Sequence, residues 1–392
     1  MRSITVLSGG VGGATFLRGL LHGVRRGLLP GVDADAEVTV VANTADDLWI
    51  HGLKVCPDLD TVMYTLGDGI DVERGWGRRG ETWHAKDELA AYGVEPTWFG
   101  LGDRDLATHL VRTQMLDAGY PLSEVTVALC RRWQPGVRLL PMSDDRVETH
   151  IAIADADAPS GRRVVHFQEY WVRLHAEVPA ETVLVVGLEE SSPAPGVVEA
   201  ITDADLVVVP PSNPVVSVGT ILGVPGVRDA LVATQAPVVG LSPIIGGTHV
   251  RGMAHQLLTA IGVEVSAAGV GLHYGARTDE PGVQEGGVLD GWLVDTTDAG
   301  EVRRVEEAGL ACAAVPLWMS DLDATAAMAA AAVSLVADRV CRACSRSGRP
   351  TVSARCTRET TSPTCCWKRW RAPWSRRARP AGLPWLTVTS SA

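Results

Sequence analysis

The stretch Ile4-Thr5-Val6-Leu7-Ser8-Gly9-Gly10-Val11-Gly12-Gly13-Ala14-Thr15-Phe16-Leu17 decides the fold of this 392-residue chain. It has the form of a short apolar strand, a glycine-rich turn and the start of a helix. Glycines let backbone N–H groups approach an anion closely, and a helix start adds the positive end of its dipole. The stretch therefore predicts a strand, a phosphate-binding turn and a helix, with a tightly packed turn that binds no ligand as the alternative.

Two common nucleotide-binding patterns do not fit this turn. A dinucleotide fingerprint that begins at Gly10 needs a third glycine at position 15, where Thr15 stands. A P-loop needs a Gly-Lys-Ser/Thr sequence, which is not present in the turn. The turn by itself indicates an anion site without identifying the ligand.

The composition is that of a large globular protein with an acidic body. Apolar residues make up 46% of the chain, and the net charge is −11. Residues 341–392 hold eleven Arg or Lys and one Glu, which leaves a net charge of about −21 on residues 1–340. An acidic body argues against nucleic acid as the main partner. We see no signal peptide and no apolar run of membrane-spanning length, and we expect a cytoplasmic protein that does not bind a membrane.

Strand-like and helix-like runs alternate along the body, which is typical of an α/β fold with a Rossmann-like, doubly wound, mostly parallel sheet. Strands are expected at 4–7, 38–42, 137–140, 183–186, 206–209, 238–241, 289–294 and 311–314, with a hairpin-like excursion at 150–153 and 164–167. Helices are expected at 14–24, at 58–65 with Asp58 as its cap, and at 321–340 with Ser320 as its cap. The domain is predicted to span 1–340, with a largely helical insert at about 67–133.

Residues 341–392 differ in kind from the body. They are rich in Arg, Cys, Trp, Ser, Thr and Pro and have no apolar period of 2 or 3.6. This mixture is typical of a gene read out of frame. A basic disordered tail is the alternative.

Five segments that follow predicted strands are small, polar or glycine-rich. In an open parallel sheet, ligands bind outside the carboxyl ends of the strands. The segments are 8–13, 43–47, 142–145, 211–214 and 242–247. They are expected to converge on one edge of the sheet and to form the site there.

Aspartates are concentrated in and near these segments. They are Asp46, Asp47, Asp58, Asp60, Asp103, Asp105, Asp144 and Asp145. Clustered carboxylates without matching cations are ligands for Mg²⁺, which neutralises a diphosphate in phosphoryl transfer. Capping of helices and turns is the alternative, and it is strongest for Asp58 and Asp103.

Cationic and aromatic candidates lie mainly in the insert. Arg104 stands between two aspartates, so a structural ion pair and a phosphate clamp are both open for it. Lys86 and Arg112 are the other candidate cations. Tryptophans in or near the insert can stack on a flat heteroaromatic ligand or pack in a core, and they are Trp49, Trp76, Trp83 and Trp98.

Seven motifs follow one another in a characteristic order. They are Ser8–Gly13, Asn43–Trp49, Pro57–Val62, Leu101–His109, Leu140–Asp145, Pro211–Pro214 and Ser242–Gly246. Together they resemble the 2-phospho-L-lactate transferase family (CofD, called FbiA in actinobacteria). The resemblance spans roughly residues 1–340 and does not cover the tail.

The resemblance implies a Mg²⁺-dependent transferase that makes a precursor of the deazaflavin coenzyme F-420. A guanosine-diphosphate-activated three-carbon acid donates its phosphoryl-linked group to the terminal ribityl hydroxyl of the deazaflavin and releases GMP. The sequence leaves open whether the transferred group is 2-phospholactyl or, as in actinobacterial-type members, phosphoenolpyruvyl. Family members resemble homodimers, and no covalent nucleophile is expected.

The same resemblance implies roles for individual residues. Asp47 and Asp60 would coordinate Mg²⁺ or position the attacking hydroxyl, and replacement of Asp60 by Ala is expected to lower turnover while leaving the fold intact. The glycine turn and Pro211–Pro214 would hold the guanosine diphosphate portion, and the insert around Trp83, Lys86 and Trp98 would cover the deazaflavin. The predicted substrate-binding residues are Gly9, Gly10, Gly12, Gly13, Asn43, Thr44, Thr61, Lys86, Trp98, Arg104, Met142, Ser143, Asp144, Pro211, Ser212, Asn213 and Pro214.

Two other functions remain open. A related group of regulatory proteins that bind nucleotide sugars shares the glycine turn and a similar second strand, but its second strand is followed by a glycine- and serine-rich run. An NAD-dependent oxidoreductase is indicated only by the first turn. Asn43 stands where such an enzyme has an acid that binds the ribose.

Overall fold

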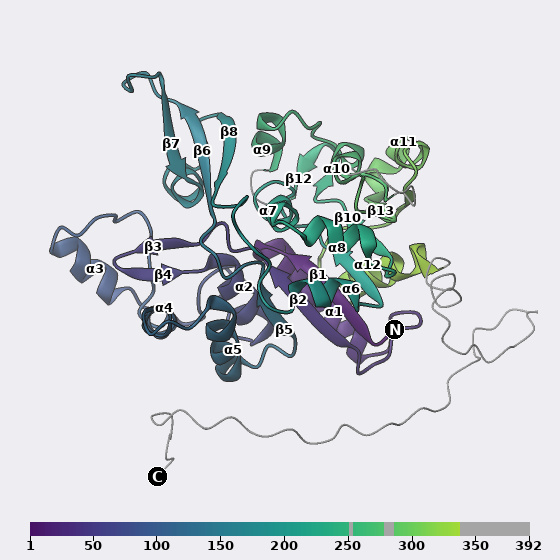
Figure 1. Cartoon of the computed structure of the whole chain (residues 1–392), viewed down its shortest axis with the longest axis horizontal. Coiled ribbons are helices and arrows are strands. Elements are labelled where there is room, and N and C mark those ends of the chain that lie inside the picture. The colour runs from purple at the N-terminus through teal and green to yellow at the C-terminus, as the bar shows by residue number, and fades with distance from the viewer. Residues whose placement is uncertain (251–253, 278–285, 338–392) are drawn as a thin grey trace, which may run out of the picture. The chain divides into compact units, whose positions relative to one another are not determined.

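The structure is a computed structural model, and it describes residues 1–250, 254–277 and 286–337. The predicted tail, residues 341–392, and the last three residues of the predicted final helix lie outside the described residues. Within the described part, one large parallel sheet organises the chain (Figure 1).

This sheet has seven strands in the order β14-β13-β10-β9-β1-β2-β5. The strands are β1 (Ser3–Ser8), β2 (Glu37–Ala42), β5 (Arg138–Pro141), β9 (Leu206–Val209), β10 (Val238–Leu241), β13 (Gly291–Val294) and β14 (Ala311–Ala314). Every pair of neighbours is parallel. The predicted doubly wound α/β fold is therefore confirmed, and its topological switch point lies between β1 and β9.

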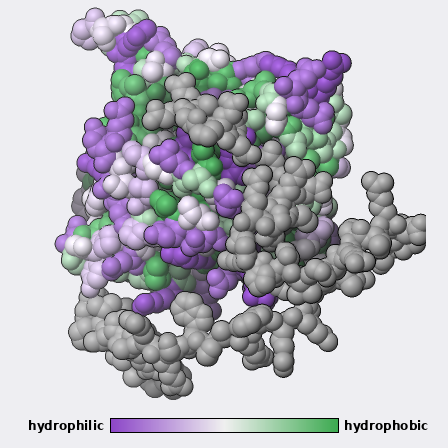
Figure 2. All heavy atoms as spheres, turned by 45° about the vertical axis from the view of Figure 1, so that its right-hand side comes forward, coloured by the Kyte–Doolittle hydropathy of each residue, from purple (hydrophilic) through white to green (hydrophobic). Residues whose placement is uncertain are grey.

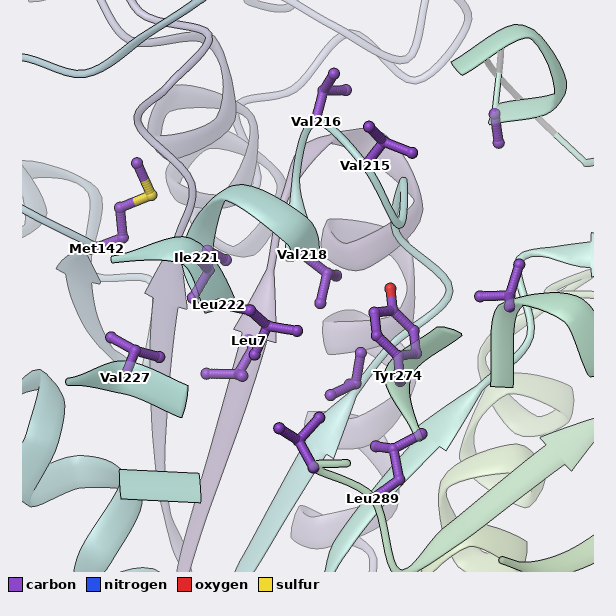
Figure 3. Packing of buried hydrophobic residues seen from close by; sticks show 14 of the residues in the cluster. Leu7, Met142, Val215, Val216, Val218, Ile221, Leu222, Val227, Tyr274 and Leu289 are labelled. Carbon is purple, nitrogen blue, oxygen red and sulfur yellow. The ribbon is translucent and has the colours of Figure 1, made fainter. Parts of the chain in front are cut away.

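Alternate residues of the strands enter two different cores. Val6 and Val40 face a cluster that includes α1 (Gly10–Arg25), α2 (Pro57–Leu66), α5 (Leu122–Trp133) and α12 (Leu322–Leu335). Leu7 and Val41 face a cluster with α6 (Val197–Thr202), α7 (Val218–Gly223), α8 (Val227–Ala233) and α10 (Ala267–Tyr274). In Figure 3, Leu7 lies beside Leu222 on this second face. Burial on both faces explains why these strands are continuous apolar runs.

A second sheet has three antiparallel strands in the order β7-β6-β8. They are β6 (Glu148–Ala154), β7 (Arg162–His166) and β8 (Ala180–Val186). The π-helical turn Glu169–Arg173 lies between β7 and β8. The expected hairpin is confirmed, but the expected placement of 183–186 in the main sheet is wrong because β8 pairs with β6. Leu184 and Val186 are exposed on one face of this sheet, so an apolar run here does not mean burial on both faces.

Three helices occur within residues 67–133, namely α3 (His84–Ala91), α4 (Asp105–Asp117) and α5. Helix α5 packs on β5, whereas α3 and α4 lie near a hairpin of β3 (Leu48–Ile50) and β4 (Leu53–Val55) (Figure 1). The short pair β11 (Ile244–Ile245) and β12 (Thr248–His249), the helices α9 (Ala254–Ala260) and α11 (Val302–Glu307), and the 3-10 turn Thr296–Glu301 complete the described elements.

Several helix starts differ from the sequence-based expectation. Helix α1 begins at Gly10 rather than at residue 14, so most of the glycine turn is already helical. The cap of α12 is Asp321, whose carboxylate accepts a hydrogen bond from the N–H of Ala324, and not Ser320. The capping position of α2 is Cys56, because the Asp58 carboxylate instead accepts a hydrogen bond from Asn43.

The described residues include no helix with the length and apolar character needed to cross a membrane. On the face drawn in Figure 2, hydrophobic residues are interspersed with hydrophilic ones.

Cys56, Cys130 and Cys312 are free thiols.

Candidate active site

The glycine turn meets the segment after β9 at the switch point of the sheet. Ser212 holds both backbone groups of Gly9: its hydroxyl accepts from the Gly9 N–H at 3.3 Å and donates to the Gly9 carbonyl at 2.9 Å. A Cβ at Gly12 would lie 2.5 Å from the Pro211 carbonyl oxygen, and one at Gly13 only 2.1 Å from the Ser8 hydroxyl oxygen. Close packing of α1 on this segment therefore accounts for two of the glycines without any ligand.

The start of α1 nevertheless has the character of an anion site. Its first turn contains no acidic residue, and the capping position is Gly9, which has no side chain to accept from the first N–H groups. Gly10, with a φ of 61°, donates its N–H toward Asp58. The positive end of the helix dipole is therefore directed at the carboxyl edge of the sheet.

Asn43 joins three elements below this turn. Its amide nitrogen donates to the Asp58 carboxylate at 2.9 Å. Its amide oxygen accepts from the Ala45 N–H at 2.9 Å and from the Thr220 hydroxyl at 2.8 Å. Asn43 thus ties the end of β2 to α2 and α7. Burial raises the pKa of Asp58 to about 6, although the bond from Asn43 opposes the shift.

Asp46 and Asp47 follow Asn43 and are almost fully buried. Among the described residues, neither Asp47 oxygen has a hydrogen-bond partner, and the same holds for Oδ1 of Asp46. Burial raises the pKa of both carboxyl groups, and for Asp46 the charges of Asp58 and Asp47 add to the effect. Neighbouring carboxylates whose oxygens lack hydrogen bonds fit a hard divalent cation such as Mg²⁺, which takes one or two carboxylates and completes its shell with water and phosphate oxygens.

Lys54 of β4 supplies a positive charge that the sequence-based search did not find. Its ammonium nitrogen lies 3.3 Å from Oδ2 of Asp47, and its side chain is largely buried. Burial lowers the pKa of Lys54, but the charge and hydrogen bond of Asp47, together with Cys56 and Glu148, leave the pKa raised overall. A lone lysine in the otherwise apolar run 53–56 was the signal that could have identified it.

Asp60 lies in a buried ion pair with Arg112 of α4. Both carboxylate oxygens of Asp60 accept hydrogen bonds from the guanidinium group, one of them at 3.0 Å from Nη1. The network continues through His109, whose Nδ1 lies 3.1 Å from Arg112, to Asp105, which also accepts from the Tyr64 hydroxyl at 2.6 Å. These contacts fasten α4 to α2. The part of Asp60 in metal binding stays a prediction, since its oxygens already have a cationic partner.

Two histidines of the three-stranded sheet lie close to Asp47. The rings of His150 and His166 are 5.4 Å apart between centroids, and their residues pair across β6 and β7. A contact with the backbone of Asp47 raises the pKa of His166, and the positive charge of Lys54 lowers it. Burial and the neighbouring His150 lower the pKa of His166 to about 4, so its ring is neutral at physiological pH.

The predicted residues after β5 mainly hold the structure together. Met142 is fully buried, and Figure 3 shows it among core side chains. The Ser143 hydroxyl donates to the Ser192 carbonyl at 2.6 Å. Asp144 accepts from the N–H of Ser123 at 2.6 Å and from its hydroxyl at 2.8 Å, which caps the first turn of α5. Their roles in substrate binding stay predictions.

Other predicted residues lie around the switch point. The Asn213 side chain accepts from the N–H groups of Val215 and Val216, which shapes the turn Pro211–Pro214 into α7. Thr61 is buried on α2. The hydroxyl group of Thr44, like that of Ser8, is buried without a hydrogen-bond partner in the described part of the chain.

The predicted residues of the insert form a separate group near α3. The Lys86 ammonium lies 5.8 Å from the centre of the Trp83 ring, and Trp98 packs edge-on against Phe99. A small pocket here is lined by His51, Lys86, Leu89, Ala90, Val94, Pro96, Thr97, Phe99, Leu101 and Leu106.

Two charged residues at the edge of the insert have structural partners. Arg104 donates from Nη1 to the Arg79 carbonyl at 3.3 Å and from its backbone N–H to Glu81 at 2.6 Å, and the ion pairs found among the described residues include none between Arg104 and an aspartate. Asp103 accepts from the N–H groups of His84 and Ala85, so it caps α3.

Comparisons with known proteins agree with this architecture. The sequence model of the family 2-phospho-L-lactate transferase CofD matches residues 4–334. A phosphoenolpyruvate transferase of Streptomyces griseus is 62% identical over 332 residues, which cover 85% of this chain and 98% of the relative. The phosphoenolpyruvate transferase of Mycolicibacterium smegmatis is 56% identical over 332 residues, with coverage of 85% and 98%.

A solved structure from Bacillus halodurans shares the fold. It matches with a TM-score of 0.52 at 17% sequence identity and covers 85% of this chain and 99% of its own. The family match and the curated relatives extend over the whole main sheet and the site at its edge. The chain belongs to the 2-phospho-L-lactate transferase CofD family.

Proposed function

We propose that this protein transfers a phosphoenolpyruvyl or 2-phospholactyl group from a guanosine-diphosphate-activated donor to the ribityl hydroxyl of a deazaflavin and releases GMP. Transferase activity itself follows from the family and from relatives named phosphoenolpyruvate transferase. The observation that carries the proposal further is the set of buried carboxylate oxygens of Asp46 and Asp47 at the carboxyl edge of the sheet. Asp47 has an ion pair with Lys54, but three of these oxygens lack hydrogen bonds within the described residues.

Mg²⁺ would be held by Asp46 and Asp47, with Asp60 as the predicted further ligand. When bound, the ion would neutralise charge on the diphosphate. The start of α1 would bind phosphate oxygens through the N–H groups of its first turn. Ser212 fixes the Gly9 backbone, and this keeps the turn in the shape that such binding requires.

In the proposed reaction, the hydroxyl oxygen of the acceptor forms a bond to the phosphorus that carries the three-carbon acid. The bond from that phosphorus to the GMP oxygen breaks, and the hydroxyl proton passes to a carboxylate. Asp58 is suited to accept it because burial places its pKa at about 6, close to physiological pH. Phosphoryl transfer of this kind depends mainly on alignment and charge stabilisation.

The insert is proposed to cover the acceptor. Lys86 lies beside the Trp83 ring and Trp98 packs on Phe99, and Lys86 and Phe99 line the small pocket at α3, so aromatic side chains that could stack on a flat ring surround it. A homodimer and a cytoplasmic location complete the proposal and stay predictions.

A direct assay tests this function. The protein is incubated with Mg²⁺, the deazaflavin and guanosine-activated phosphoenolpyruvate or phospholactate, and the products are separated by charge. We expect a deazaflavin product of increased negative charge together with an equal amount of GMP. The Asp47→Asn variant is expected to lose about 100-fold or more in turnover. The matched variant Asp68→Asn, at an exposed surface carboxylate, should retain wild-type activity.

The assay also separates the alternative functions. Absence of product with both donors, combined with tight binding of a nucleotide sugar, would favour the regulatory group. Hydride transfer from a nicotinamide cofactor would favour an oxidoreductase. An NAD-dependent oxidoreductase has an acidic residue at the end of the second strand that binds the ribose. Here Asn43 stands at that position, and its side chain already bonds to Asp58, Ala45 and Thr220.

A further inference from the structure

The Lys54 ammonium lies where a cation would neutralise the buried Asp47 carboxylate. Among the ion pairs of the described residues, Asp47 takes part in one, and its partner is the Lys54 ammonium at 3.3 Å. Arg112, a nearby cation, is already bound through its guanidinium to Asp60. The charge of Asp47 in this structure is therefore balanced by Lys54.

The backbone of Lys54 is fixed by hydrogen bonds, whereas its ammonium is held by the ion pair with Asp47. Its N–H donates to the Thr113 hydroxyl at 2.9 Å, and its carbonyl oxygen accepts from Nη1 of Arg112 at 3.4 Å. Both partners belong to α4, which the Asp60 ion pair holds in place. The four-carbon stem beyond this anchored backbone can still change rotamer and move the ammonium.

The ion pair between Lys54 and Asp47 leaves several buried oxygen atoms of the described residues around it without hydrogen bonds. Although the ammonium is near, neither Asp47 oxygen has a donor in hydrogen-bond geometry within the described part of the chain, and Oδ1 of Asp46 and the Thr44 hydroxyl are also without partners. Buried polar atoms without hydrogen bonds are costly. A divalent cation with its waters would satisfy more of these atoms than a single ammonium does.

We propose that Lys54 is an exchangeable counter-cation of this site. It neutralises Asp47 in the metal-free protein, and a divalent cation bound by Asp46 and Asp47 displaces its ammonium, which then becomes available to the phosphate groups of the donor. Lysine binds phosphate as a mobile point charge, which suits such an exchange. The displacement rests on the metal site of the proposed function, and the step to the donor rests in addition on the proposed donor.

Chemical labelling of the wild-type protein tests the displacement. The chain has three lysines, Lys54, Lys86 and Lys368, so each can be followed by mass spectrometry after brief acylation. We expect labelling of Lys54 relative to Lys86 to rise about tenfold when Mn²⁺ is added, because the displaced ammonium leaves its buried ion pair with Asp47 and is then accessible to the reagent. An unchanged ratio at saturating Mn²⁺ would overturn the proposal.

Metal affinity of variants gives a second test. In calorimetric titrations without donor, Lys54→Met is expected to bind Mn²⁺ about tenfold more tightly than the wild type, because the competing charge is gone. Lys54→Arg should stay close to the wild type, and Arg303→Met serves as a control for loss of an exposed charge. Equal or weaker Mn²⁺ binding by folded Lys54→Met would contradict the exchange.

The donor half is tested with GDP as the probe. With Mn²⁺ present, Lys54→Met should bind GDP about tenfold more weakly than the wild type does. Equal GDP affinity of the two proteins would overturn this half. If the wild type itself does not bind GDP, the proposed function fails, and the displacement by metal is then judged from the labelling and the metal titrations alone.

Discussion

At the residue scale, the buried ion pair between Asp60 and Arg112 stabilises the fold. The same pair occupies the carboxylate oxygens that the sequence assigned to metal binding. Arg112 is among the largest fully buried side chains, and both oxygens of Asp60 accept from it. A buried charge that loses its partner is strongly destabilising. The structure therefore changes the expectation that replacement of Asp60 leaves the fold intact.

We predict that Asp60→Ala lowers the free energy of unfolding by about 3–5 kcal/mol, because it leaves the Arg112 guanidinium buried without its carboxylate. Urea denaturation followed by circular dichroism measures the change. The double variant Asp60→Leu/Arg112→Met should recover much of the loss, and Asp68→Asn, which removes an exposed ion pair and keeps a residue type that tolerates the φ of 56° at this position, should change little. A loss below about 1 kcal/mol for Asp60→Ala would show that the pair is not essential.

The lowered pKa of His166 predicts that the stability of the fold depends on pH. Its pKa is lowered from 6.5 to about 4 by burial and by His150, so between these values the unfolded chain binds a proton that the folded chain does not. Stability from this group is full above pH 6.5 and is lost as the pH falls toward 4, by at most about 3 kcal/mol. Unfolding experiments across this range should show a flatter profile for His166→Gln.

The control for this prediction is His84→Gln, at an exposed position on α3. It should keep the wild-type pH profile. A His166→Gln profile as steep as that of the wild type would contradict the assignment of this pH dependence to His166.

At the scale of elements, the contact between α1 and the turn Pro211–Pro214 shapes the anion site. We predict that Gly12→Ala destabilises the protein by about 1–3 kcal/mol, because its Cβ would lie 2.5 Å from the Pro211 carbonyl oxygen and would force the two segments apart. It should also weaken GDP binding, measured by calorimetry. Gly300→Ala, at a position with nothing within 4 Å of the added Cβ, is the matched control.

Equal stability and GDP affinity for Gly12→Ala and Gly300→Ala would contradict the close fit of α1 on this turn. Loss of stability with unchanged GDP affinity would show that the glycines serve packing alone. That outcome would favour the ligand-free alternative for the turn.

At the scale of the whole molecule, the described strands and helices all lie within residues 3–335. The family match also ends at residue 334. We predict that a chain ending at residue 349 unfolds within about 2 °C of the full chain in scanning calorimetry. A much lower transition temperature would show that residues 350–392 contribute to stability.

The oligomeric state is a further prediction at this scale. Light scattering after gel filtration should give about twice the 41.5 kDa of one chain if the predicted homodimer forms. A mass near that of one chain at all concentrations would contradict it.

The sequence by itself determined the parallel sheet and the edge at which the site is proposed. Runs such as Val38–Ala42 and Leu206–Val209 are apolar because both faces of a parallel strand are buried, and this pattern is local. The same local reasoning failed for β8, because an apolar run can also form an edge strand of a small antiparallel sheet. It failed for the cap of α12 as well, because Ser320 and Asp321 are both residue types that cap helices.

Only the tertiary structure decided which aspartates are free for chemistry. Asp60 and Arg112 are 52 residues apart in the sequence, and Lys54 reaches Asp47 because the β3–β4 hairpin folds back. Whether a carboxylate meets a guanidinium, a capping N–H or no donor depends on how distant segments pack, as Asp60, Asp144 and Asp46 show. Residue type sets the chemistry that a side chain can perform, and its neighbours in space determine whether that chemistry is available.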